Sequence, residues 1–364
     1  MIYFDYAATS IKRKEILEYI LKNKEDFDGN PESLHGYGRI ARKILEESRE
    51  KIAESLNANP ENIIFTSGAS ESNNTIIKNF DDENFEIIST AVEHPSILEA
   101  LKSTKSSVKY LHTDKNGIIN INYLKNNLSE KTKLVCVMLA NNETGAIQPV
   151  KEIGEILKEK NIWFHVDAVQ GYGHLDIDVR KLNCNSMSIS GHKIGGINSF
   201  GVLFADKKIK NLIYGGEQEN SLRAGTSFVA GAFSMAESYK KSMNEREKLS
   251  DLKKYFVESL LKKKIDFEIN GENTAPHILN LYFPFVENQF LLTFLDLRGI
   301  CISAGSACSA GSLSPSHVIS DMYDEERANH SVRFSFGYLN DFSEIDFATD
   351  ILKELFERKK DAKK

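Results

Sequence analysis

Short apolar runs alternate with amphipathic segments between about residues 38 and 205. Residues 39–56 place their apolar side chains on one helical stripe and end at an Asn-Ala-Asn-Pro sequence, which predicts a helix that stops there. Residues 150–159 follow the same helical spacing. Three short runs predict buried strands: residues 63–65 and 134–139 are continuously apolar, and residues 162–166 are apolar apart from His165. This alternation predicts an α/β layer whose mainly parallel strands are joined by right-handed helical crossovers.

After about residue 235 the pattern changes to long, lysine-rich helical sequence. Two strand-like runs and a final helix follow, at residues 278–283, 331–335 and 343–359. Because 364 residues are more than one core usually supports, we expect two domains. The predicted division gives residues 15–245 to a large domain, and residues 1–14 with 246–364 to a smaller α+β domain.

The composition is that of an ordinary globular protein, with 41% hydrophobic and 27% charged residues. A net charge of −6 argues against a nucleic-acid partner, which would require a dense positive surface. The four cysteines form no Cys-x-x-Cys pair, so neither a metal site nor a disulfide network is indicated. With no secretory signal and no apolar stretch long enough to span a membrane, we expect a cytoplasmic protein.

Residues 66–72, Thr-Ser-Gly-Ala-Ser-Glu-Ser, lie between a predicted strand and a helix-like segment. Free backbone N–H groups at the start of a helix, beside a glycine and small hydroxyl residues, are suited to binding phosphate. The alternative interpretation is an ordinary turn that only caps the helix.

Asp167 follows a predicted apolar strand, where a carboxylate faces the ligand crevice of a parallel sheet. Such an aspartate can keep the ring nitrogen of pyridoxal 5'-phosphate (PLP) protonated, which makes that cofactor an electron sink. Lys193 stands 26 residues later in Ser190-Gly191-His192-Lys193, where it could form a Schiff base while its neighbours bind phosphate. A lysine alone is more often a surface residue, so the hypothesis depends on the pair.

Residues 302–316 form a loop of small residues that contains Cys308. Free cysteines are usually buried, as expected for Cys136, Cys184 and Cys301, whereas a thiol on a polar loop is accessible and reactive. Arg333 lies inside a strand-like run, where it could bind a substrate carboxylate through two hydrogen bonds. The alternatives are a chance cysteine in a loop and a salt bridge on the face of a sheet.

Taken in order, these segments resemble the cysteine desulfurases of the NifS/IscS type, which are class-V aminotransferase-like, fold-type I PLP enzymes. The resemblance runs nearly from end to end. It is carried by residues 5–9, Asn30-Pro31, 66–72, Glu93-His94, 141–145, 165–170, 190–193, 223–226, 303–316 and 333–337. It implies an enzyme that removes sulfur from L-cysteine, releases L-alanine and carries the sulfur as a persulfide.

The resemblance also implies roles for individual residues around PLP. Lys193 would form the Schiff base, Asp167 would pair with the ring nitrogen, Gln170 would bond the ring hydroxyl and His94 would stack on the ring. The cofactor phosphate would be held by Ala69, Ser70, Ser190, His192 and, from a second subunit, Thr226. A homodimer is therefore expected.

Other residues would act on the substrate. Arg333 and Asn142, with Asn30, would bind L-cysteine, and Cys308 would accept its sulfur. His94 is also the candidate base for the thiol. The sulfur would pass to an acceptor protein, such as an iron–sulfur scaffold or a tRNA-thiolation enzyme. The resemblance leaves the acceptor open, because the chain ends soon after its last predicted helix, where many members carry an acceptor-binding extension.

The sequence departs from the family pattern at a few positions. Ser70 stands where threonine is common, and Glu217 interrupts a common run of glycines. The alternatives within enzymes are a selenocysteine lyase or a related PLP aminotransferase, in which Cys308 has no role. A non-catalytic sulfur-relay protein is less consistent with the joint presence of Lys193, Asp167 and Cys308.

Overall fold

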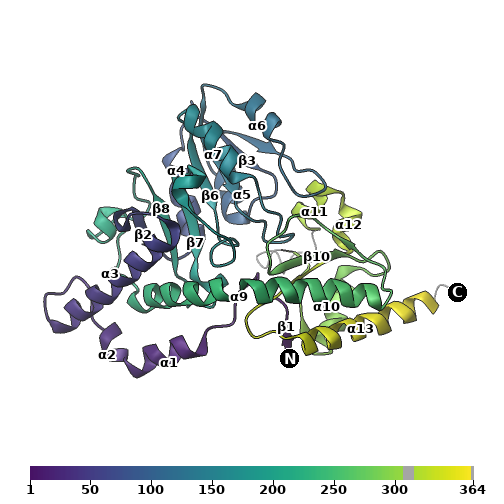
Figure 1. Ribbon diagram of the computed structural model, residues 1–364. Coiled ribbons are helices and arrows are strands. Elements are labelled where there is room, and N and C mark those ends of the chain that lie inside the picture. Colours follow the sequence, from purple (N-terminus) through teal and green to yellow (C-terminus); the bar gives the residue numbers. More distant parts are fainter. Residues whose placement is uncertain (306–314, 362–364) are drawn as a thin grey trace.

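The computed structural model describes residues 1–305 and 315–361. A large sheet with its helices forms one part of the molecule, and the C-terminal strands and helices form the other (Figure 1). Both parts pack on one long helix, α9 (Val229–Lys262), which runs from beneath the large sheet into the second part (Figure 1).

The described residues form a seven-stranded sheet in the order β2-β8-β7-β6-β5-β3-β4. Its strands are β2 (Ile63–Thr66), β3 (Glu86–Thr90), β4 (Ser107–Leu111), β5 (Thr132–Met138), β6 (Trp163–Asp167), β7 (Ser186–Ser190) and β8 (Gly201–Ala205). Strand β8 runs in the opposite direction to the other six, antiparallel to both β2 and β7. The carboxyl ends of the other six strands therefore meet at one edge, together with the amino end of β8.

Helices cover the large sheet because their apolar stripes need a surface to bury. They are α3 (Gly36–Leu56), α4 (Ala69–Asn79), α5 (Pro95–Lys102), α6 (Ile121–Asn127), α7 (Val150–Glu159) and α8 (Val179–Leu182), with α1 (Lys14–Lys22) and α2 (Lys24–Phe27) preceding them. Helix α7 has the predicted bounds and buries Ile153 and Leu157. Helix α3 begins three residues before the predicted start, because the side chain of His35 accepts the Gly38 N–H and caps it.

In the second part, the described residues form a three-stranded sheet ordered β12-β10-β9. Its strands are β9 (Glu268–Ile269), β10 (Ile278–Tyr282) and β12 (Ser331–Ser335), and its helices are α10 (Asn288–Asp296), α11 (His317–Met322), α12 (Glu325–Asn329) and α13 (Phe342–Asp361). Strand β1 (Ile2–Tyr3) pairs in parallel with β11 (Ile300–Cys301), which brings the N-terminus beside the C-terminal elements (Figure 1).

Helix α9 contributes to both hydrophobic cores. Its first half places Met235 in the core under the large sheet, and its second half places Leu252 and Phe256 in the core of the second part. The predicted domain boundary at residue 245 lies inside this helix. The division into domains stays a prediction, and the continuous helix means that the two cores share a rigid element.

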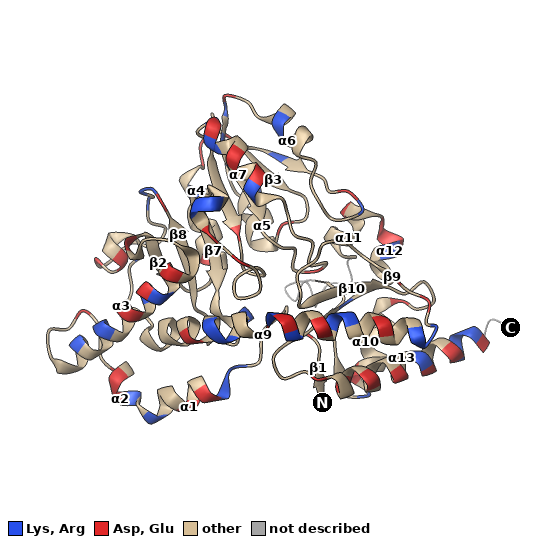
Figure 2. Cartoon of the chain, viewed as in Figure 1, with Lys and Arg blue, Asp and Glu red and all other residues tan. Residues whose placement is uncertain are grey.

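Charged residues are interspersed on the outer helices. Blue and red segments alternate along α9 and α13 (Figure 2). Lysine and glutamate pair one turn apart, as in Lys254–Glu258 and Lys353–Glu357. Among the described residues, no helix is both long and apolar enough to cross a membrane.

The packing of the second core depends strongly on the side chain of Phe256. Its ring lies 4.6 Å from that of Phe334 and 5.8 Å from that of Phe336, measured between centroids, and it is fully buried. We expect Phe256→Ala to lower the free energy of unfolding by about 3–5 kcal/mol, because the cavity cannot close fully. Urea unfolding followed by circular dichroism measures this effect. Lys254→Ala, on the exposed face of the same helix, is the control, and equal midpoints for the two variants would contradict the assignment.

Candidate active site

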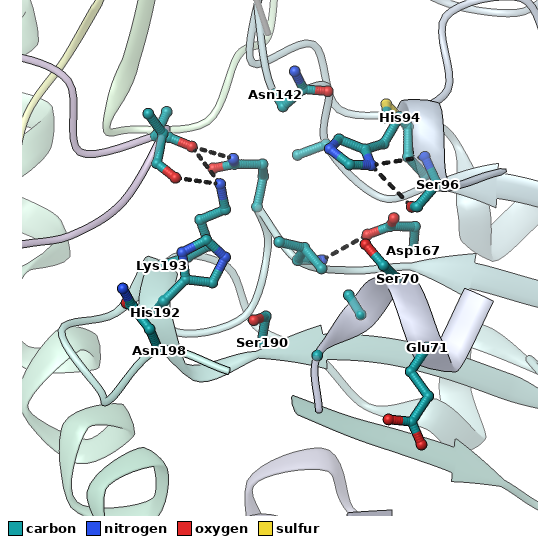
Figure 3. Close-up of a pocket in the computed structure, with 18 of the residues that line it drawn as sticks. Ser70, Glu71, His94, Ser96, Asn142, Asp167, Ser190, His192, Lys193 and Asn198 are labelled. Carbon is teal, nitrogen blue, oxygen red and sulfur yellow. Dashed lines mark hydrogen bonds between the residues drawn. The ribbon is translucent and has the colours of Figure 1, made fainter. Parts of the chain in front are cut away.

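A cavity of about 420 Å³ opens at the carboxyl edge of the large sheet. Residues from the ends of β2, β3, β5, β6 and β7 line it, as the rule for open parallel sheets predicts. Most of the residues predicted from the sequence lie on its wall: Ala69, Ser70, His94, Asn142, Asp167, Gln170, Ser190, His192, Lys193 and Arg333. Figure 3 shows Lys193, Asp167 and His94 pointing into this one cavity from separate segments.

The turn before α4 presents backbone N–H groups to the cavity. Gly68 precedes the helix with a φ of 148°, a conformation that side chains rarely adopt, and among the described residues no side-chain cap is found at the helix start. The neighbouring Gly201 permits this approach, because a Cβ there would lie 2.6 Å from the Gly68 Cα. The N–H groups beside Ala69 and Ser70, together with the helix dipole, therefore form a site suited to an anion.

Asp167 ends β6 and receives a hydrogen bond on each carboxylate oxygen. Asn73 Nδ2 donates to Oδ2 at 2.9 Å, and the Val169 N–H donates to Oδ1 at 3.0 Å. The Asn73 amide is itself fixed by a second contact, because its Oδ1 lies 2.9 Å from Nε2 of the buried His165. These bonds offset the cost of burying the carboxylate and fix its orientation.

His94 is connected to the same asparagine through Ser96. Asn73 Nδ2 donates to Ser96 Oγ at 2.8 Å, and Ser96 Oγ lies 2.9 Å from His94 Nδ1. The Ser96 N–H also donates to Nδ1 at 3.1 Å. Ser96 can therefore satisfy either neutral tautomer, by donating from its backbone or by accepting at Oγ. Burial lowers the pKa of His94 below its ordinary value, although the nearby Asp167 charge opposes this shift.

Lys193 lies directly after β7, in a short 3₁₀ turn (Gly191–Lys193). Its Nζ donates to two backbone carbonyl oxygens of the N-terminal segment, Ala7 O at 2.7 Å and Ala8 O at 2.8 Å (Figure 3). Burial, followed by the charge of Lys193, lowers the pKa of His192 to about 3. The ring next to Lys193 is therefore neutral at physiological pH.

Arg333 lies in the middle of β12 and is almost fully buried. One of its terminal nitrogens donates to Asn142 O at 2.6 Å and the other to Asp5 Oδ1 at 2.8 Å. Its Nε is buried and has no hydrogen-bond partner among the described residues. The guanidinium is thus held at the cavity wall by partners from two distant segments, and its Nε–H remains without an acceptor among the described residues.

Three predicted residues are not placed in this cavity. Asn30 and Thr226 are exposed and do not line it, and Cys308 lies outside the described residues. The role given to Thr226 requires a second subunit, so it stays a prediction. Of the cysteines expected to be buried, Cys136 and Cys184 are buried and Cys301 is partly exposed.

Several residues at the site were missed by the sequence analysis. Asn73 holds both Asp167 and Ser96, and it lies in the helix-like segment after residues 66–72, where no pattern in the sequence marked it. Ala7 and Ala8 act through backbone carbonyls, which leave no side-chain signature. Asn198 lines the cavity from the loop before β8, a segment to which no role had been assigned.

Glu93, beside His94, is a fully buried carboxyl group. Its Oε1 accepts from Thr90 Oγ1 and the Met138 N–H, both at 2.8 Å, and its Oε2 has no partner among the described residues. Burial raises the pKa of this carboxyl from 4.5 to about 8, with a smaller contribution from the Asp167 charge. The group is therefore protonated in the native protein near neutral pH.

This raised pKa predicts how stability depends on pH. The native state binds the Glu93 proton more tightly than the unfolded state, so this contribution to stability is lost as pH rises from about 4.5 to about 8. Glu93→Gln keeps the acceptor oxygen and cannot ionise. The unfolding free energy of the variant minus that of the wild type should therefore increase by about 1 kcal/mol or more as the pH is raised from 5 to 8. Denaturant unfolding at both pH values measures this, and parallel pH profiles would contradict it.

Comparisons with known proteins agree with this geometry. Residues 2–347 match the class-V aminotransferase family. The cysteine desulfurase IscS of Dictyoglomus turgidum is 39% identical over 373 residues, which cover 98% of this chain and 95% of that protein. The solved structure of a NifS-like protein superposes with a TM-score of 0.89 at 32% identity, covering 98% of this chain and 99% of that one.

A solved structure of SspA in complex with cysteine is also similar, with a TM-score of 0.82, 32% identity and coverage of 92% of this chain and 99% of that one. The NifS-like structure confirms the predicted fold class, fold-type I with a mainly parallel large sheet. The chain therefore belongs to the class-V aminotransferase family, within its IscS- and NifS-type cysteine desulfurases.

Proposed function

We propose that this protein is a PLP-dependent cysteine desulfurase, which takes sulfur from L-cysteine, releases L-alanine and holds the sulfur as a persulfide on Cys308. The observation that carries the proposal is the convergence of Lys193, Asp167 and Arg333 on one cavity, in a chain of this family. These three residues offer an amine, a carboxylate and a guanidinium to a single small ligand.

The cavity residues fit PLP by their chemistry. The uncapped N-terminus of α4 offers N–H donors and open space beside Gly68 for a phosphate. Asp167, fixed by two donors, would pair with a protonated ring nitrogen, and Gln170 would bond the ring hydroxyl. The volume of about 420 Å³ lies in the range of small-ligand pockets. Ala69, Ser70, Ser190 and His192 would bind the phosphate, with Thr226 of a second copy.

PLP, when bound through Lys193, supplies an electron sink for charge that develops at the substrate Cα. Lys193 is placed to take the Cα proton, because the carbonyl oxygens of Ala7 and Ala8 stabilise a positive charge on Nζ. His94 would stack on the cofactor ring, and Ser96 holds the His94 ring in position through its Oγ and its backbone N–H.

The substrate carboxylate would bind at Arg333, with Asn142 beside it and Asn30 as a further candidate. The salt bridge to Asp5 and the bond to Asn142 O set the plane of the guanidinium before any ligand arrives. A preset guanidinium loses less conformational freedom on binding. Recognition of the carboxylate therefore depends on the N-terminal segment as well as on β12.

Sulfur transfer requires the thiolate of Cys308. It attacks the substrate sulfur, a sulfur–sulfur bond forms, the substrate Cβ–S bond breaks, and its electron pair stays on carbon, which takes a proton to become the methyl group of alanine. An unperturbed thiol has a pKa of about 8.5, so a base is needed at neutral pH. His94 is the candidate, since its lowered pKa keeps the ring neutral and Ser96 Oγ can hold Nδ1–H while Nε2 accepts.

The proposal also covers the oligomeric state, the cellular location and the sulfur acceptor of the enzyme. A cytoplasmic homodimer would complete each phosphate site with Thr226 of its partner. The persulfide would pass to an acceptor protein, such as an iron–sulfur scaffold or a tRNA-thiolation enzyme. A selenocysteine lyase or an aminotransferase would use the same cavity, and the products distinguish them, because an aminotransferase releases a keto acid and a selenocysteine lyase releases selenium.

Lys193→Ala should abolish the Schiff-base absorption near the visible edge that the wild type shows with PLP. It should also lower turnover by at least about 100-fold, the usual contribution of one acid–base group. Absorption spectra and alanine release measure the two effects. Lys210→Ala, an exposed lysine outside the cavity, is the control; retained absorption in Lys193→Ala would move the Schiff base to another residue.

Cys308→Ala should still bind PLP and change its spectrum when L-cysteine is added, yet release no sulfide or alanine above background. The reason is that no thiol remains to take the sulfur. Cys301→Ala, close by in sequence and outside the cavity, should behave as wild type. Normal turnover by Cys308→Ala would rule out its assignment as the sulfur acceptor.

A further inference from the structure

Two histidines are stacked directly behind the cavity. The rings of His174 and His277 lie 3.7 Å apart between centroids at an interplanar angle of 20°, and both are buried. His174 belongs to the turn that follows β6, and His277 immediately precedes β10 in the second part of the molecule. Neither residue lines the cavity, and neither has a role in the proposed chemistry.

His277 contacts a residue of the cavity wall. Its Nε2 lies 3.1 Å from Gln170 Oε1, while Gln170 Nε2 donates to Ala7 O at 2.9 Å. An amide oxygen can only accept, so the neutral His277 ring carries its proton on Nε2 and donates it. The amide of Gln170 is thereby held in one of its two orientations, with its oxygen turned toward His277 and its NH₂ group toward Ala7.

This orientation determines what Gln170 can offer to a ligand. An amide NH₂ group has two hydrogens, and among the described residues the NH₂ of Gln170 has Ala7 O as its acceptor. The second hydrogen is available to an oxygen in the cavity. If the amide were reversed, it would place its oxygen there and repel such a ligand atom.

His174 contacts the other side of the site. Its ring lies close enough to the backbone of Lys193 for that backbone to oppose the lowering of the His174 pKa by burial. Gly173, with a φ of 79°, lets the chain turn sharply before it, and a Cβ at that glycine would lie 2.6 Å from a methyl carbon of Ile194. The stacked pair therefore spans from the Lys193 backbone to the Gln170 side chain.

The rings of His174 and His277 are both neutral near physiological pH. Burial lowers the pKa of His174 to about 4 and that of His277 well below its ordinary value. The Nδ1 atoms of both rings are buried without hydrogen-bond partners among the described residues. Each unpaired nitrogen costs free energy. A pair of apolar side chains would avoid this cost but could not donate to Gln170 Oε1.

We propose that His277, stacked on His174, is a positioning residue that fixes the Gln170 amide so that its free N–H faces the oxygen on the cofactor ring. The inference rests on the proposed function, because it assigns Gln170 to PLP. It adds a second layer to the site, supplied by the segment before β10 rather than by the large sheet.

The test compares three variants with the wild type as purified proteins freed of PLP. His277→Leu fills similar space and donates no hydrogen bond. His277→Gln restores an N–H donor at about the reach of imidazole Nε2. Phe336→Leu is the matched control, because Phe336 is buried, its N–H binds His277 O, and its side chain packs into the second core. PLP is titrated into each, followed by the Schiff-base absorption and by fluorescence of the single tryptophan, Trp163.

We expect His277→Leu to bind PLP roughly five- to tenfold more weakly, the effect of losing one buried hydrogen bond. The pH midpoint of its Schiff-base absorption should also shift, and His277→Gln should recover most of both properties. Phe336→Leu should lower the melting temperature and leave both properties unchanged. The inference is overturned if His277→Leu matches Phe336→Leu, with a lower melting temperature but wild-type affinity and midpoint.

Two further results keep the inference separable from the proposed function. If the wild type itself forms no Schiff base with PLP, the proposed function fails, and the role of His277 toward PLP fails with it. If His277→Leu does not fold, His277→Met takes its place, because a flexible thioether fills the space without donating. Wild-type affinity in His277→Met would then overturn the inference.

Discussion

A buried carboxylate must be paired, and the pairing of Asp167 organises the site. Its two oxygens are bound by Asn73 from α4 and by the backbone of Val169. Asn73 also holds Ser96, which in turn holds His94. Because removal of one donor would leave a costly unpaired acceptor, the ends of three elements are tied together at fixed positions. The cavity is shaped by this network before any ligand binds.

The N-terminal segment closes the network from the other side. Ala7 O accepts hydrogen bonds from both Lys193 and Gln170, and Asp5 pairs with Arg333. The first eight residues therefore contact the amine, the amide and the guanidinium of the site. Since β1 pairs with β11 and α9 links the two cores, the two parts of the molecule meet at a cavity to which both contribute.

The sequence was informative where function follows from local pattern. Asp167 was identified because it ends an apolar strand, and Lys193 because it stands in a glycine-flanked turn after the next one. The Arg333–Asp5 pair could not be predicted, because its partners are 328 residues apart. The carbonyls of Ala7 and Ala8 were missed since any residue supplies a carbonyl. The stacked His174 and His277 were missed because only the folded chain brings them together.

The central claim is that this cavity converts L-cysteine to alanine and transferable sulfur. The most direct measurement mixes the purified protein with PLP, L-cysteine and a reductant, and quantifies sulfide and alanine in the same sample. The account predicts equal amounts of both products, formed with repeated turnover. Neither product, from a protein that shows a normal Schiff-base spectrum, would contradict it.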